Sequence, residues 1–234
     1  MKSIYQTALI VGAGDGLSAS IARAFADKGG MRIALAARNP GKLAGLVKEL
    51  GAQALECDAS DRSQVETMFA RADELLGASP DVVVYNPSYR VRGPFLEVDP
   101  GDVAKALAIT AYGGFLVAQQ AAKRMVPRGS GAILFTGASA SIKGYPQSAT
   151  FAMGKFALRG LAQSIARELA PKGVHVAHFV IDGGIRSATR IEPADAPDSM
   201  LDADAIARSY LHILEQDRSA WTWEVELRPW VEKF

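Results

Sequence analysis

The chain has 234 residues, of which 49% are apolar, and 26 basic residues nearly balance 25 acidic ones to give a net charge of +1. This composition is typical of a domain with a substantial core and excludes the strongly basic surface that nucleic acid or an anionic membrane binds. Cys57 is the single cysteine, so we expect no intrachain disulfide and a reducing compartment. The first predicted strand starts at residue 4 and no apolar run approaches membrane-spanning length. We therefore expect no leader or membrane segment and a cytoplasmic protein.

Strand-like and helical segments alternate along the whole sequence. The strands are predicted at 4–11, 31–37, 52–57, 81–85, 131–136, 174–180 and 221–227. The helices are predicted at 17–29, 40–50, 61–76, 100–126, 147–170 and 202–216. This alternation predicts one α/β domain over residues 1–234, a doubly wound Rossmann-type three-layer sandwich with a parallel sheet. The Pro- and Asp-rich stretch 191–204 is predicted to be a mobile loop.

A glycine-rich turn lies between the first strand and the first helix. Backbone N–H groups at a helix start bind phosphate, and glycines let a pyrophosphate approach the backbone closely. The turn is therefore predicted to hold the diphosphate of a nucleotide. The residues expected at that diphosphate are Gly12, Gly14, Asp15, Gly16 and Leu17.

The glycine spacing selects a subtype of nucleotide turn. Gly12, Gly16 and Ser18 fit G-x-x-x-G-x-G with a small residue last, whereas Leu17 breaks G-x-G-x-x-G. With the segments 157–162 and 166–169, this pattern resembles the short-chain dehydrogenase/reductase family. The resemblance implies a seven-stranded sheet of order 3-2-1-4-5-6-7, a small-molecule substrate, and a homodimer or homotetramer.

Arg38 follows the second strand, near the point where NAD-binding domains carry an acid that binds the ribose 2′-hydroxyl. Ala37 occupies the expected place of that acid. An arginine pairs with a 2′-phosphate through charge-assisted hydrogen bonds. We therefore predict that NADP (NADPH) is preferred over NAD; the alternative is a solvated loop arginine.

Asp58, followed by Ala59, resembles the family's aspartate at the adenine amino group. Asn86 occupies the place of the family's Asn-Asn-Ala-Gly motif, of which only this one residue is present. Asp and Asn at strand ends also stabilise turns, so both interpretations stay open. The stretch 182–187 stands where the family has Pro-Gly-x-x-x-Thr and implies a nicotinamide pocket. Its predicted cofactor contacts are Ile185 and Ser187.

The family's catalytic Tyr-x-x-x-Lys occurs here as Phe151 to Lys155. Its i,i+4 spacing places both side chains on one helix face. In the family the lysine holds the nicotinamide ribose and the tyrosine exchanges a proton with the substrate oxygen. Phe151 has no proton to give, although Lys155 is kept. The family's serine and asparagine positions are likewise altered, to Ala138 and Thr110.

Two neighbouring residues are candidate substitutes. Tyr145, in the loop before the same helix, could donate a proton, and Ser139 could polarise a carbonyl; each is also an ordinary loop residue. A reaction that needs less acid, such as hydride transfer to a polarised alkene, is a further alternative. Two functions therefore stay open: an NADP-dependent oxidoreductase with an altered active site, and a catalytically silent NADP-binding sensor or partner subunit.

The remaining signals are weaker. His175 and His178 fall on opposite faces of a strand with no partner at ligand spacing, so no metal site is predicted. The tryptophans near the C-terminus are interpreted as core or as a subunit contact. Arginines in the loops 87–95 and 186–200 are compatible with an anionic or polar ligand, and with plain solvation. These arginines are Arg90, Arg92, Arg186 and Arg190.

Overall fold

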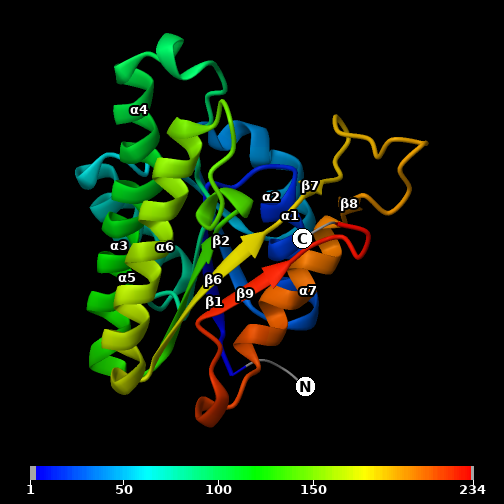
Figure 1. Ribbon diagram of the computed structural model, residues 1–234. Coiled ribbons are helices and arrows are strands. Elements are labelled where there is room, and N and C mark those ends of the chain that lie inside the picture. Colours follow the sequence, from blue (N-terminus) through cyan, green and yellow to red (C-terminus); the bar gives the residue numbers. More distant parts are fainter. Residues whose placement is uncertain (1–3, 233–234) are drawn as a thin grey trace.

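Seven parallel strands form the central layer of the protein, seen in a computed structural model that describes residues 4–232 (Figure 1). Their order is β3-β2-β1-β4-β5-β6-β9, and every neighbouring pair is parallel. This confirms the predicted doubly wound fold and strand order, β9 being the seventh strand of the sheet. The strands are β1 (Thr7–Val11), β2 (Arg32–Ala37), β3 (Gln53–Glu56), β4 (Val82–Tyr85), β5 (Gly131–Thr136), β6 (Val174–Ile181) and β9 (Glu224–Leu227).

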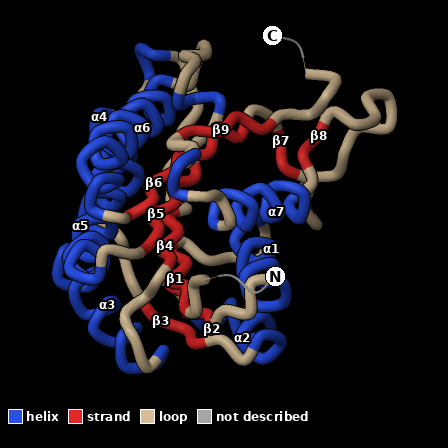
Figure 2. The backbone as a smooth tube through the Cα atoms, turned by 90° about the horizontal axis from the view of Figure 1, so that it is seen from below, coloured by secondary structure: helices blue, strands red, loops and turns tan. Residues whose placement is uncertain are grey.

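Helices cover both faces of the sheet, so the molecule has three layers (Figure 2). On one face lie α1 (Leu17–Arg23), α2 (Ala44–Leu50) and α7 (Ala203–Leu214). On the other lie α3 (Arg62–Leu76), α4 (Pro100–Leu107), α5 (Gly113–Met125) and α6 (Ala149–Leu169). Alternate residues of β1 enter two separate cores, Ile10 on the first face and Leu9 on the second. This two-sided burial explains why the central strands β1, β4 and β5 are continuous apolar runs.

Short helical turns extend or link these elements. Two are π-helical and continue α-helices, which is why single helices were predicted at 17–29 and 100–126. The π turns are η1 (Ala24–Lys28) and η4 (Ala108–Tyr112). The 3₁₀ turns are η2 (Pro40–Leu43), η3 (Phe95–Glu97), η5 (Val126–Arg128), η6 (Ser139–Ser141), η7 (Ala170–Lys172) and η8 (Arg218–Ala220).

The segment after β6 differs from the prediction. A second, two-stranded sheet pairs β7 (Gly184–Ile185) with β8 (Met200–Leu201). The predicted mobile loop over 191–204 did not include β8, which forms near its end. Asp202 then caps α7 by accepting from the N–H of Ala205, close to the predicted helix start at 202. Alternation does not reveal a two-residue strand, because it shows no period.

The helical stretch Pro100–Arg128 is 29 residues long, with a mean hydropathy of 1.2 in its most apolar window. Within residues 4–232 it is the one helix that is long and apolar enough to cross a membrane, by length and composition alone. Its apolar side chains Leu116, Val117 and Met125 are buried in the core on the α3–α6 face of the sheet. Packing within the protein therefore accounts for its apolar character.

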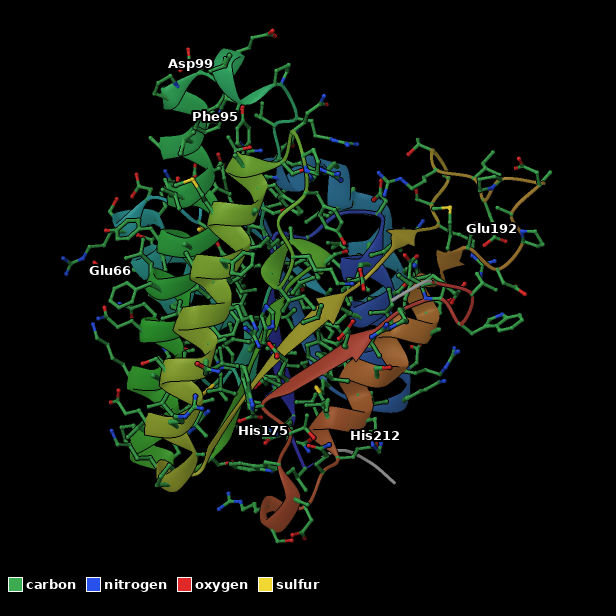
Figure 3. The ribbon with its side chains drawn as sticks, viewed as in Figure 1. Glu66, Phe95, Asp99, His175, Glu192 and His212 are labelled. Carbon is green, nitrogen blue, oxygen red and sulfur yellow. The ribbon has the colours of Figure 1, made fainter. Side chains whose placement is uncertain are left out.

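The carboxyl ends of the parallel strands meet at one edge of the sheet, where loops from distant parts of the sequence come together. Figure 3 shows Phe95 in the long connection after β4 and Glu192 in the loop between β7 and β8. His175, near the start of β6, lies toward the opposite end of the sheet. In an open α/β sheet this carboxyl edge is where ligands bind.

Candidate functional site

Two cavities adjoin at the carboxyl edge of the sheet. The first, of about 550 Å³, is lined from β1, β2, the end of β3 and the loop after β4. The second, of about 610 Å³, is lined from the loops after β4, β5 and β6 and from the start of α6. Asn86 and Ser88 line both cavities, so the two form one groove across the strand ends.

The glycine turn borders this groove and is shaped by the loop after β4. Gly12 has a φ of +80°, and a Cβ added there would lie 2.7 Å from the backbone nitrogen of Pro87. Only glycine fits such a position. Gly14 and Gly16 have open space where a side chain would stand. Gly12 and Leu17 line the groove, one in each cavity, whereas Gly14, Asp15 and Gly16 lie outside both linings.

A chain of hydrogen bonds holds this turn in place. The Asn86 side-chain amide donates to the Ser18 hydroxyl at 2.7 Å, and that hydroxyl donates to the Gly12 carbonyl at 3.1 Å. Asn86 therefore fixes the turn from β4. Gly16 caps α1 without a side-chain hydrogen bond, which leaves the first N–H groups of the helix facing the turn.

The first cavity carries positive charge beyond the glycine turn. Arg38 and Lys42 line it and both are exposed. Asp58, the one acid in this lining, accepts from the hydroxyl and the N–H of Ser60 at 2.6 and 2.9 Å. These two hydrogen bonds hold the pKa of Asp58 below its ordinary value, with a smaller contribution from Arg38. Ala59 lines the same wall.

Lys42 was not picked out from the sequence. It lies in η2, which starts at Pro40. Asn39 caps this turn, because its side chain accepts from the N–H of Gly41. This turn carries Lys42 back to the groove beside Arg38. The Asn-Pro pair directly after a buried strand was the available signal, since it favours a turn at that point.

Lys155 lies beneath the second cavity. It is buried, and its ammonium donates to the Thr136 carbonyl at 2.6 Å. Burial lowers the pKa of Lys155 to about 8. Phe151, one helical turn earlier, lines the cavity with its ring centroid 5.8 Å from the Lys155 Nζ atom. Phe151 therefore lines the cavity without a hydroxyl, and Lys155 lies outside the cavity lining.

The candidate substitutes Ser139 and Tyr145 line the same cavity as Phe151. Tyr145 is 47% exposed. Ser139 hydrogen-bonds to the buried carboxylate of Asp182, which also accepts from Lys143 at 3.0 Å. Burial alone would raise the pKa of Asp182, but these hydrogen bonds outweigh it and hold the pKa below its usual value.

The residues at the family's serine and asparagine positions, Ala138 and Thr110, form hydrogen bonds within the protein. Thr110 is buried in η4, where its hydroxyl accepts from the N–H of Tyr89 at 3.3 Å and packs against Gly154. The Ala138 N–H donates to the Ser141 hydroxyl at 3.1 Å. Neither Thr110 nor Ser141 lines the cavity. Ser148, at the start of α6, does line it and was not singled out from the sequence.

The segment after β6 supplies one predicted contact but not the other. Ile185 lines the second cavity. Ser187 is exposed, and its hydroxyl accepts from the N–H groups of Thr189 and Arg190 in a turn outside the lining. Arg190 lines the cavity instead.

The histidines lie in the core of β6. His178 approaches Glu224 at 3.1 Å, and burial lowers the pKa of His178 to about 4. His175 stacks on Trp221 with ring centroids 4.5 Å apart. Within residues 4–232 no group of three potential ligands is placed to hold a metal ion.

The residues present fit a dinucleotide. Gly12 leaves a space that a Cβ would close, and Asn86 supports the turn. The groove joins two cavities of similar volume, one for each half of a dinucleotide. Gly12 to Leu17 would hold the diphosphate. Arg38 and Asp58 would hold the adenosine half, and Lys155 with Ile185 the nicotinamide half.

Comparisons with known proteins agree with this geometry. A family model described as short chain dehydrogenase matches residues 6–195. D-threitol dehydrogenase of Mycolicibacterium smegmatis is 31% identical over 178 residues, which cover 73% of this chain and 67% of that protein.

Among solved structures, a short-chain dehydrogenase from Rhodopseudomonas palustris is 35% identical with a TM-score of 0.81, over 96% of this chain and 99% of that one. A metagenomic short-chain oxidoreductase in complex with NADP is 26% identical with a TM-score of 0.80, over 96% and 97%. Strand order, nucleotide turn and sequence similarity thus agree along most of the chain, which belongs to the short-chain dehydrogenase/reductase family of nicotinamide-dependent oxidoreductases.

Proposed function

We propose that the protein is an NADP-dependent oxidoreductase whose proton-transfer apparatus departs from the family pattern. The observation that carries the cofactor preference is the pair Arg38 and Lys42 in the lining of the first cavity. Two cations at this wall favour a 2′-phosphate, whereas an acid there would repel it. The NADP complex of the 26% identical metagenomic oxidoreductase supports the assignment.

In this proposal Lys155 holds the nicotinamide ribose from below the second cavity. A bound nicotinamide supplies or accepts the hydride. Tyr145 is the one phenol in the cavity lining and exchanges the proton with the substrate oxygen, while the Ser139 hydroxyl oxygen accepts from a substrate hydroxyl. Asp182 orients the Ser139 hydroxyl.

The cofactor preference is tested by calorimetric titration of NADPH and NADH. We expect tighter binding of NADPH, and about a tenfold loss of NADPH affinity in Arg38→Ala, because a charge-assisted hydrogen bond is removed. NADH affinity should not change. Arg167→Ala, an exposed arginine on α6 outside both cavities, is the control. Equal affinities for the two nucleotides, or no binding, would contradict the proposal.

A second candidate is a catalytically silent NADP-binding sensor or partner subunit. The observation that favours it is the joint change at three positions: Phe151 lacks the hydroxyl, Thr110 is committed to packing, and Ala138 has no side-chain donor. The two candidates share the cofactor groove and differ in turnover.

We also propose a single domain in the cytoplasm that assembles as a homodimer or homotetramer. The helices α5 and α6 lie side by side on one outer face (Figure 1). Exposed apolar side chains gather on them and on the adjoining η4. These are Tyr112, Phe115, Met153 and Phe156. Aromatic side chains are enriched in interface cores. Sedimentation velocity measures the state, and a monomer at all concentrations would contradict it.

A further inference from the structure

The charged residues that line the second cavity are all positive. Its lining contains two arginines, Arg90 and Arg190, and no aspartate or glutamate. Within residues 4–232 neither arginine forms an ion pair, whereas the nearby Arg186 is neutralised by Asp202 at 3.3 Å. Two unpaired guanidinium groups in a concave site create a positive potential that an anion relieves.

Arg90 is exposed, but hydrogen bonds of the residues on both sides of it hold the backbone of its loop. Tyr89 donates its N–H to Thr110 and its hydroxyl to Asp102 at 2.9 Å. The Val91 carbonyl accepts from the Thr150 hydroxyl at 2.8 Å. The loop is therefore attached to α4 and η4 on one side of Arg90 and to α6 on the other.

The side chain of Arg90 lies on Phe151. Its guanidinium carbon is 5.2 Å from the centroid of the ring, within the range of a cation–π contact. This contact uses the face of the ring and needs no hydroxyl. It gives the aromatic ring at position 151 a role that survives the loss of the phenol.

Arg190 reaches the cavity from the loop after β6. Its N–H donates to the carbonyl and the hydroxyl of Ser187 at 3.2 and 3.1 Å, which closes a tight turn. Its side chain passes 3.9 Å from the point where a Cβ on Gly184 would stand. The Arg190 side chain therefore passes within van der Waals reach of β7.

We infer that the second cavity takes a small substrate that carries a carboxylate, which Arg90 binds through its planar fork of N–H donors while Phe151 supports the guanidinium face. Arg190 adds a second positive charge to the same cavity. The inference rests on the proposed function, because the cofactor occupies the adjoining part of the groove. A guanidinium binds carboxylates bidentately, which gives both affinity and orientation.

The test compares benzoylformate with its neutral methyl ester, titrated calorimetrically into the protein saturated with NADP⁺. The oxidised cofactor prevents reduction of the ketone during the measurement. We expect benzoylformate to bind about tenfold more tightly than the ester, as for a hydrogen bond to a charged group. Arg90→Gln should reduce this preference several-fold, with Arg190 still present, and leave the binding of the ester and of NADP⁺ unchanged.

Arg92→Gln is the matched control, because Arg92 is an exposed arginine of the same loop outside the cavity lining. It should keep the preference. Equal binding of acid and ester, an equal loss in Arg92→Gln, or no binding of either probe overturns the inference. Tighter binding of benzyl phosphate than of benzoylformate also overturns it, in favour of a phosphate ester. Failure to bind NADP⁺ itself counts against the proposed function, and this inference falls with it.

Discussion

At residue 151 the aromatic ring is present and the hydroxyl is not. Phe151 lines the second cavity, with the cationic groups of Arg90 and Lys155 5.2 and 5.8 Å from its centroid. The ring therefore still has electrostatic partners, while the proton donor of the family has to be replaced. A ring at this position can therefore contact cations without a hydroxyl.

Restoring the phenol distinguishes the enzyme from the silent binder. In Phe151→Tyr we expect NADPH-dependent reduction to rise across a panel of carbonyl compounds, by about 10²-fold if the missing acid alone limits the rate. The measurement is the loss of NADPH absorbance. Phe156→Tyr, an exposed position one turn further along α6, is the control. No gain in Phe151→Tyr would mean that the cavity has also diverged and would favour the silent binder.

Lys155 makes the stability depend on pH. Burial lowers the pKa of Lys155 to about 8, against an ordinary value of 10.5 in the unfolded chain. Between these two values the unfolded state binds the extra proton. Stability therefore rises with pH through this window and is lost as pH falls through the folded-state value.

Replacing the lysine should remove this dependence. We expect the free energy of unfolding of Lys155→Met to rise less steeply between pH 8 and 10.5 than that of the wild type. The difference in slope should be up to about 1.4 kcal/mol per pH unit. Urea unfolding at several pH values measures both slopes. Parallel curves would show that Lys155 keeps its ordinary pKa in the folded protein.

At the scale of elements, the packing of η4 and α5 against β4 places one residue in the wall of the first cavity. The Tyr85 hydroxyl donates to the carbonyl of Ile109, which lies in η4 and lines the first cavity. A Cβ on Gly113 would overlap this hydroxyl and lie 2.7 Å from the Ala59 carbonyl oxygen. Close approach of the helix to β4 therefore depends on a glycine at the start of α5.

Adding one methyl group here should be costly. We expect Gly113→Ala to lower the free energy of unfolding by about 1–3 kcal/mol, because the new Cβ meets backbone that cannot move aside easily. Gly45→Ala is the matched control, since its Cβ would stand in open space on α2. It should stabilise the protein by about 0.5–1 kcal/mol through helix propensity. Urea unfolding measures both, and equal effects would contradict the packing argument.

Elements with a long period could be predicted, and those without one could not. The strands of the sheet and α6 follow from apolar runs and helical spacing over many residues. The π turn η4 and the pair β7–β8 depend on contacts made elsewhere in the fold. The shorter start of β1, at Thr7 rather than residue 4, falls within the usual uncertainty of element ends.

For the whole molecule, the groove exists because parallel strands bring their carboxyl ends to one edge. Residues of the first cavity come from three consecutive strands and the loop after β4, and are brought side by side by the order β3-β2-β1-β4. The glycine turn that starts at Gly12 could be expected from local sequence. The contributions of Lys42 and Ser148 could not be expected in this way. Lys42 reaches the groove because it lies in the turn η2, and Ser148 because the loop before α6 brings it there.

The amino-acid sequence by itself determined the layered α/β fold, the glycine turn and the absence of a hydroxyl at position 151. These depend on residues a few positions apart, whose periods and steric limits are readable without coordinates. Only the tertiary structure decided that Arg90, Tyr145 and Arg190 line one cavity and that Arg90 lies on Phe151. These contacts depend on how separate loops pack at the edge of the sheet, and a local sequence pattern carries no information about that packing.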